Sequence, residues 1–364
     1  METERAQQTR ERIKVEESRA RTRFLLTAFS LAAGVCLSML LACSFGRMTI
    51  PAAGVIEAML SGCGFGTPGL SDPTWKVIVC DIRLSRVVLS ALVGGSLAVA
   101  GVAFQGILRN PLADPFTIGV STGAAFGASL AIFLGLGGSA LWGLELVPLA
   151  SLGGALAALF TVIALARVSG RLRRDTMVLA GIVVATFLSA LISLVKSLDE
   201  ESVSSIVFWV MGSFQGRGWN HVVFALPYLA AGMLLIGFST RELDILSLGD
   251  TQAKQLGVEV NRVRLRFLVG ASLLTAGSVS VSGVIGFVGL VVPHLIRMLA
   301  GPQHGRLLVL SGLLGAMALT WSDVAARIVL SGGEELPVGV VTALMGGPFF
   351  CVLLKWKREA SAFD

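Results

Sequence analysis

Long runs of apolar residues, broken by short polar segments, follow one another along nearly the whole chain. A helix crosses the hydrocarbon core of a bilayer with about 20 apolar residues, because its backbone groups must be hydrogen-bonded within the segment. The pattern predicts ten such spans, of which the seventh and eighth are nearly continuous: 24–44, 87–108, 116–136, 147–166, 177–195, 222–238, 267–284, 285–299, 307–328 and 338–354. The predicted fold class is therefore an all-α integral membrane protein with about ten transmembrane helices.

Polar segments set the boundaries of this predicted domain. Residues 1–23 mix acidic and basic side chains and lack the apolar core of a cleavable signal, so we expect a charged cytoplasmic tail there. Residues 24–356 form the predicted transmembrane domain, whose longest polar inner loop is 241–266. Residues 357–364 are predicted to be a second, short cytoplasmic tail.

The composition agrees with a bilayer as the solvent. Hydrophobic residues make up 54% of the chain and charged residues only 14%, whereas soluble domains carry roughly 25% charged residues. The mean hydropathy is +0.80. The 43 glycines also fit, because small residues let membrane helices pack closely.

The distribution of basic residues predicts the orientation. An even number of spans places both termini on one side, and 22 of the 29 lysines and arginines fall on that side and its loops. Cytoplasmic loops carry such an excess of positive charge, so both termini are predicted to be cytoplasmic. The net charge of +6 then reflects membrane topology, and we expect no nucleic-acid partner.

Motifs for catalysis and for cofactors are absent from the sequence. No Gly-Lys pair occurs, so the chain has no phosphate-binding Walker A loop. The three histidines, His221, His294 and His304, are not at metal-ligand spacing. We therefore expect no enzymatic activity, no cofactor and no bound metal.

Two of the five cysteines lie in the long first outer loop. Cys63 and Cys80 face a compartment that permits oxidation, so a disulfide between them is one possibility and two free thiols are the other. Cys36, Cys43 and Cys351 lie in apolar spans and are interpreted as small core residues.

Glycine-rich segments indicate an internal repeat. Residues 95–102 read GSLAVAGV and residues 277–284 read GSVSVSGV, an offset that corresponds to five spans. Two halves related in this way have inverted topology, a common arrangement in transporters. Gly119, Gly123 and Gly127 recur every four residues and form a smooth stripe, which serves either helix packing within the subunit or the lining of a pore.

Four segments together resemble the FecCD-type permease family, which imports ferric siderophores, haem and cobalamin. They are RLSRVVLSALVGGSLAVAGVAFQGILRNPLADPFTIGVSTGAAFG at 83–127, FWVMGSFQGRGW at 208–219, LGDTQAKQLG at 248–257 and SGVIGFVGLVVPHLIRMLAGPQHGRLL at 282–308. The resemblance covers about 24–356. It implies the permease architecture of a type II ATP-binding-cassette (ABC) importer, in the bacterial cytoplasmic (inner) membrane.

The resemblance also implies partners. Such a permease is a homodimer surrounded by membrane lipid, and its pathway lies along the dimer axis. Two cytoplasmic ATP-binding subunits supply the energy, and an extracytoplasmic substrate-binding protein delivers the metal chelate. Ferric siderophore is the leading expectation for that chelate, ahead of haem and cobalamin.

The polar loop at 241–266 resembles the segment that couples the permease to its ATPase. Its leucines and small residues suit a short helix bounded by glycine breaks, which would seat in a groove of the ATP-binding subunit; a mere linker is the simpler alternative. The residues implied are Leu248, Gly249, Ala253, Leu256 and Gly257.

Three arginines at predicted outer span ends correspond to positions that dock the binding protein in similar permeases. They are Arg83, Arg86 and Arg327. Charges at span ends are often interfacial anchors instead. Arg327 also lies four residues after Asp323 on one predicted helix, so an internal ion pair competes with docking.

The resemblance places the translocation pathway near the fifth span, the segment 209–219 and the tenth span. Trp209, Gly212 and Ser213 are the residues implied there. Other motif residues have expected pathway or structural roles: Asn110 and Pro111 in a turn between the second and third spans, and Pro293 and His294 in the eighth span.

Two other classes of function fit the sequence less well. A secondary transporter driven by an ion gradient usually buries carboxylates near the bilayer midplane, and the first eight predicted spans contain almost none. A membrane-embedded enzyme would need a catalytic constellation, which the motifs do not supply. An importer permease is the better prediction.

Overall fold

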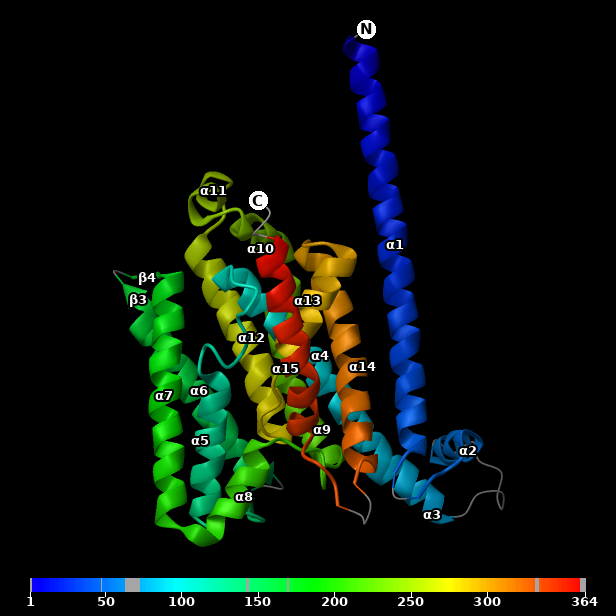
Figure 1. Cartoon of the computed structure of the whole chain (residues 1–364), viewed down its shortest axis with the longest axis vertical. Coiled ribbons are helices and arrows are strands. Elements are labelled where there is room, and N and C mark those ends of the chain that lie inside the picture. The colour runs from blue at the N-terminus through cyan, green and yellow to red at the C-terminus, as the bar shows by residue number, and fades with distance from the viewer. Residues whose placement is uncertain are drawn as a thin grey trace.

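Long apolar helices run side by side through the body of the computed structural model (Figure 1). The structure describes residues 2–46, 48–62, 73–141, 144–168, 170–330 and 334–360. Its helices are α1 Glu2–Ser44, α2 Ala52–Gly62, α3 Pro73–Lys76, the π-helix η1 Val77–Arg83, α4 Leu84–Leu108, α5 Val120–Phe133, α6 Leu146–Ala166, α7 Arg174–Leu198, α8 Glu200–Val210, α9 Trp219–Gly237, α10 Thr240–Ser247, α11 Asp250–Gln255, α12 Val260–Ser282, α13 Val288–Ala300, α14 His304–Ile328 and α15 Val338–Ala360.

Two small antiparallel hairpins complete the described elements. β1 (Ala140–Leu141) pairs with β2 (Leu144–Glu145), and Ala140 lies opposite Glu145. β3 (Arg167–Val168) pairs with β4 (Arg171–Leu172), and Arg167 lies opposite Leu172. The second hairpin joins α6 to α7 and lies at the same end of the molecule as α10 and α11 (Figure 1).

Within the described residues, seven helical segments are long and apolar enough to cross a membrane. They match seven of the predicted spans and are 18–44, 74–108, 146–166, 174–198, 219–237, 260–282 and 304–328. The other three predicted spans correspond to shorter apolar helices, α5, α13 and the apolar part of α15. The all-helical membrane fold is confirmed, whereas ten full-length spans are not.

Positive φ angles explain why two of those helices are short. Turns and irregular backbone occupy the residues from Pro111 to Gly119, which has φ +80°. α5 therefore begins only at Val120. Gly283 (φ +69°) and Phe287 (φ +67°) bound a non-helical stretch between α12 and α13. The nearly continuous seventh and eighth spans are therefore separated by a break in the helix.

Two predicted boundaries also shift. α1 continues without interruption from Glu2, so the backbone of the predicted tail is helical. The predicted loop at 241–266 consists mainly of α10 and α11, and its last seven residues already belong to α12, which begins at Val260. Polarity at the start of α12 concealed the beginning of that helix, because sequence polarity reports solvent exposure and not backbone conformation.

α4 lies at the centre of the bundle. Nearly every residue from Ser85 to Leu108 is buried, against α12, α13 and α14. A Cβ atom at Gly101 would lie 1.9 Å from the carbonyl oxygen of Gly289 on α13, so only glycine permits this approach. The first repeated segment lies in α4, and the second begins in α12 and ends two residues beyond it. α4 and α12 run in opposite directions, as inverted halves require (Figure 1).

The glycine stripe of the third predicted span packs inside the subunit. A Cβ at Gly123 would lie 2.5 Å from the carbonyl oxygen of Gly154 on α6, and one at Gly127 would lie 2.1 Å from that of Ala150. Gly119 lies against Gly181 of α7. Of the two interpretations of the stripe, helix packing is the one that the structure shows.

Candidate functional site

Two short helices project at one end of the bundle, called here the α10–α11 end (Figure 1). Gly249 (φ +130°) precedes α11, and Gly257 (φ +81°) follows it. Only glycine adopts these backbone angles at low cost. The predicted short helix between two glycine breaks is therefore present.

The predicted coupling residues divide into buried and exposed ones. Ala253 is fully buried and holds α11 against the rest of the subunit. Leu248 and Leu256, on either side of α11, are 59% and 61% exposed. Large apolar side chains with this exposure, at an end of the molecule, are available to a protein partner.

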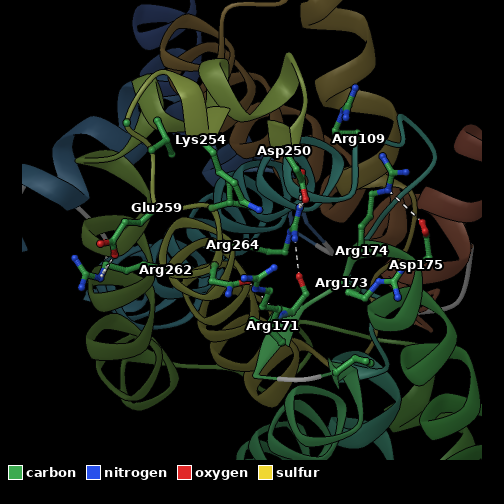
Figure 2. Close-up of a pocket in the computed structure, with 16 residues that line it drawn as sticks. Arg109, Arg171, Arg173, Arg174, Asp175, Asp250, Lys254, Glu259, Arg262 and Arg264 are labelled. Atoms are coloured by element: carbon green, nitrogen blue, oxygen red, sulfur yellow. Dashed lines mark hydrogen bonds and ion pairs between the residues drawn. The ribbon is translucent and has the colours of Figure 1, made fainter. Parts of the chain in front are cut away.

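Arg264 of α12 ties together three parts of the α10–α11 end. Its Nη2 lies 2.9 and 3.1 Å from the carboxylate oxygens of Asp250 in α11, and its Nη1 donates to the carbonyl oxygen of Leu172 at 2.6 Å. The amide of Leu172 donates in turn to Asn261 Oδ1. Figure 2 shows Arg264 between Asp250 and the hairpin strand.

A basic cavity of about 980 Å³ opens around this arginine. Seven of its lining side chains are arginine or lysine and three are carboxylates (Figure 2). They come from the end of α4, from β3–β4 and the start of α7, and from α11 and the start of α12. We call this feature the basic cavity.

The three predicted docking arginines lie at the other end of the bundle, called the α2–α8 end, and all three are buried. Arg83 donates to the carbonyl oxygens of Cys43 (2.8 Å), Ser44 (3.2 Å) and Met48. These bonds fix the turn after α1 against η1. The Arg83 side chain therefore has structural partners inside the subunit.

Arg86 and Arg327 share one buried carboxylate. Arg86 of α4 contacts both oxygens of Asp323, whose side chain is 0% exposed, and lies 2.8 Å from Glu335. Arg327 Nη2 lies 3.2 Å from Asp323 Oδ2 and donates through Nη1 to the carbonyl oxygens of Ala42 and Phe45. Of the two partners considered for Arg327, Asp323 and the binding protein, Asp323 is the one that it contacts in this conformation.

Three predicted pathway residues meet at one junction. Trp209 lies in the last turn of α8, and Gly212 (φ +73°) lies against the carbonyl oxygen of Val284 in the break after α12. The amide of Ser213 donates to the carbonyl oxygen of Ser282 at 2.8 Å, and that of Gly339 in α15 donates to Gly212. An apolar cavity of about 400 Å³ adjoins this junction between α8, the break and α15.

The remaining motif residues lie elsewhere. Asn110 and Pro111 form the turn after α4, and Asn110 Oδ1 accepts from the amide of Leu112 at 2.9 Å. Nearby, burial raises the pKa of the Asp114 carboxyl, although backbone amides that donate to it partly oppose this. Pro293 is buried and His294 half-buried within α13, so the structure does not gather these four with the junction residues.

The predicted pair Cys63–Cys80 cannot be placed, because Cys63 lies outside the described residues. Cys80 belongs to η1 and its thiol lies 3.4 Å from the carbonyl oxygen of Ala58 in α2. The disulfide stays a prediction.

Sequence reasoning missed the roles of Arg264, Asp250 and Glu335. Arg264 stands in a run of three alternating arginines at 262, 264 and 266, and in the sequence this run indicates only positive charge on one side of the membrane. A basic residue at the start of a long apolar helix, beside a short helix that begins with Asp250, is the signal that could have indicated their ion pair.

Comparisons with known proteins agree with this architecture. The FecCD transport family matches residues 34–356. The uncharacterized ABC transporter permease protein YvrB of Bacillus subtilis is 41% identical over 87% of this chain and 90% of its own length. The cobalamin import system permease protein BtuC of Halobacterium salinarum is 42% identical over 79% of this chain and 76% of its own length.

A solved structure extends the likeness to three dimensions. It is described as an inward-facing conformation of a metal-chelate type ABC transporter, and it superimposes with a TM-score of 0.77 at 32% identity. The match covers 90% of this chain and 98% of that structure. With a family match over most of its length and a bundle of the same architecture, the chain belongs to the FecCD transport family of ABC permeases.

Proposed function

We propose that this protein is the membrane-spanning subunit of an importer for a metal chelate, and that it works as a homodimer with two ATPase subunits and a substrate-binding protein. The observation that carries the proposal is the likeness, over nearly the whole chain, to a metal-chelate type ABC transporter. In this proposal the protein lies in the bacterial inner membrane with both termini in the cytoplasm. The α10–α11 end then faces the ATPase.

Energy would reach the permease through α11. Leu248 and Leu256 are exposed on the α10–α11 segment, and Ala253 anchors α11 to the core of the bundle. Because Arg264 joins Asp250 to the α6–α7 hairpin, a displacement of α11 is passed to two long helices, α7 and α12. The exposed leucines make the contact with the ATPase in this mechanism.

The chelate would pass close to the junction of α8 and α15. Several side chains near it are large, apolar and exposed, among them Phe208 on α8 and Leu344 on α15. Apolar walls of this kind let a bulky complex pass without being held, since they offer few hydrogen bonds to be broken. The second copy of the subunit would close the pathway by facing these residues.

Docking of the binding protein at Arg83, Arg86 and Arg327 stays a proposal. Its support is their place at the α2–α8 end, opposite the proposed ATPase contact. Each of them already has partners within the subunit. A carboxylate of the binding protein would therefore have to compete with Asp323 or Glu335 for a guanidinium group.

The ligand class in the proposal is a metal chelate, with ferric siderophore as the first candidate and haem or cobalamin as the others. One similar permease is named for cobalamin import. A panel of these chelates, titrated into the cognate binding protein and followed by tryptophan fluorescence, identifies the ligand. If the binding protein binds none of these chelates, the proposed ligand class is wrong.

The test of the function is uptake by the reconstituted complex. The permease is placed in proteoliposomes with its cognate ATPase, and the loaded binding protein is added outside. Uptake should require internal ATP and should persist when ionophores remove all ion gradients. Uptake that needs a gradient and ignores ATP would instead identify an ion-driven secondary transporter.

A further inference from the structure

The basic cavity carries an excess of positive charge that the subunit does not neutralise. Three of its cations have carboxylate partners: Arg174 with Asp175 at 3.3 Å, Arg262 with Glu259 at 3.1 Å and Arg264 with Asp250 at 2.9 Å. The other four are Arg109, Arg171, Arg173 and Lys254, which make no ion pair with the residues that the structure describes. The cavity therefore suits an anionic ligand.

Arg264 supplies a second, independent indication of an anion. Its side chain is only 2% exposed, and its Nε has no hydrogen-bond partner in the described part of the chain. A buried cationic N–H without a partner costs free energy, and the guanidinium group lies in the wall of the cavity (Figure 2). An anion in the cavity would stabilise the charge of this guanidinium group.

The cavity lies where membrane helices end. α4 ends at Leu108, α6 ends at Ala166, α7 begins at Arg174 and α12 begins at Val260, and the cavity lies among these four termini. A helix that crosses the hydrocarbon core has its two ends at the depth of the lipid headgroups. An anion at this depth is in reach of the phosphates of the bilayer itself.

Apolar side chains continue from the cavity toward the hydrocarbon. Val168 in the cavity wall is 42% exposed, and Leu165, one turn earlier at the end of α6, is 52% exposed. They offer a surface for an acyl chain beside the basic groups. The volume of about 980 Å³ accommodates a whole headgroup, whereas a single phosphate ion would leave most of it filled by water.

We propose that the basic cavity binds the headgroup of an acidic phospholipid, and that this lipid holds α11 and the β3–β4 hairpin together. Basic pockets between transmembrane helices on the cytoplasmic side suit such headgroups. The lipid phosphate would lie among Arg171 on the hairpin, Arg173 at the start of α7 and Lys254 on α11. An ATPase that pushes on α11 would then act on a segment stiffened by the lipid.

The binding test compares two pairs of substitutions. Arg171→Gln with Arg173→Gln removes two charges from the cavity. Arg167→Gln with Arg241→Gln removes two exposed charges at the same end of the molecule that do not line the cavity. Purified dimers from nanodiscs that contain phosphatidylglycerol and phosphatidylcholine are analysed by native mass spectrometry for retained lipid.

We expect the unmodified protein and the control pair to retain phosphatidylglycerol, and the cavity pair to retain about 25-fold less, since each surface cation gives about a fivefold preference for acidic lipid. Phosphatidylglycerol should also raise the melting temperature of the unmodified protein and of the control pair, and should leave that of the cavity pair unchanged. Equal retention by both pairs of variants would overturn the proposal.

Two further measurements separate the other possible occupants. Inorganic phosphate, added to the protein in detergent, should raise the melting temperature much less than phosphatidylglycerol does; an equal effect would make this a site for free anions. ATPase binding is then measured in pure phosphatidylcholine. If the cavity pair binds the ATPase much more weakly there than the control pair does, the cavity is an ATPase contact and the lipid proposal fails.

Discussion

Arg86 and Asp323 lie 237 positions apart in the sequence and are joined by a bidentate ion pair inside the bundle. Arg86 Nε lies 3.1 Å from each carboxylate oxygen, and Nη2 lies 2.8 Å from Oδ1. The pair links α4 to α14, and Arg327 contacts the same carboxylate from one turn along α14. Asp323 thus compensates both buried cations, and Glu335 adds a second carboxylate beside Arg86.

Removal of the Asp323 carboxylate should destabilise the protein strongly. Asp323→Asn leaves Arg327 buried without its carboxylate and Arg86 with Glu335 alone. Breaking a buried pair in this way costs about 3–5 kcal/mol. Unfolding in detergent, followed by circular dichroism against temperature or denaturant, measures the loss. Asp81→Asn, an exposed carboxylate in η1, is the control and should change stability by less than about 0.5 kcal/mol. Equal stability of the two variants would mean that the network contributes nothing.

Charge reversal at the docking positions should first affect folding. Arg83→Glu with Arg86→Glu places carboxylates beside the carbonyl oxygens of the α1 turn and beside Asp323, which are repulsive contacts. Size-exclusion chromatography should show a low yield of folded protein, and uptake should fall in proportion to it. A variant that elutes normally and loses only its affinity for the binding protein would show that these arginines serve docking.

The neighbouring glycines of α6 provide a matched pair for the packing of α5 against α6. A Cβ at Gly154 would lie 2.3 Å from the carbonyl oxygen of Gly123, whereas one at Gly153 meets no atom within 4 Å. Gly154→Ala should therefore lower the free energy of unfolding by about 1–3 kcal/mol, and Gly153→Ala should leave it nearly unchanged. Equal free energies of unfolding for the two variants would show that α5 and α6 do not approach each other this closely.

Exposed and buried residues of the α10–α11 segment should respond differently to substitution. Leu248→Glu with Leu256→Glu should uncouple ATP hydrolysis from uptake at normal stability, because both side chains lie at the surface. Ala253→Leu should instead lower thermal stability, because its side chain would enter a filled core. ATPase rate, uptake and melting temperature are measured for each. Normal coupling in the double leucine variant would remove the proposed ATPase contact.

The sequence alone determined which solvent this fold requires and which family the chain belongs to. A bilayer demands long apolar segments whose backbone bonds are internal, so the runs at 147–166, 177–195 and 307–328 predicted α6, α7 and α14 to within three residues at each end. The short helix α11 was predictable as well, because two glycines mark its ends. These are local properties, and each depends only on neighbouring residues.

Tertiary structure decided which charged side chains are available to partners. Arg83, Arg86 and Arg327 stand at span ends in the sequence, where charges usually meet water, but α1 and α14 supply carbonyl and carboxylate partners that cover them. The basic cavity likewise gathers residues from α4, β3–β4, α11 and α12. The ion-pair and hydrogen-bond partners of these charged side chains come from helices that are distant in the sequence. The pattern of apolar residues does not indicate which helices pack together.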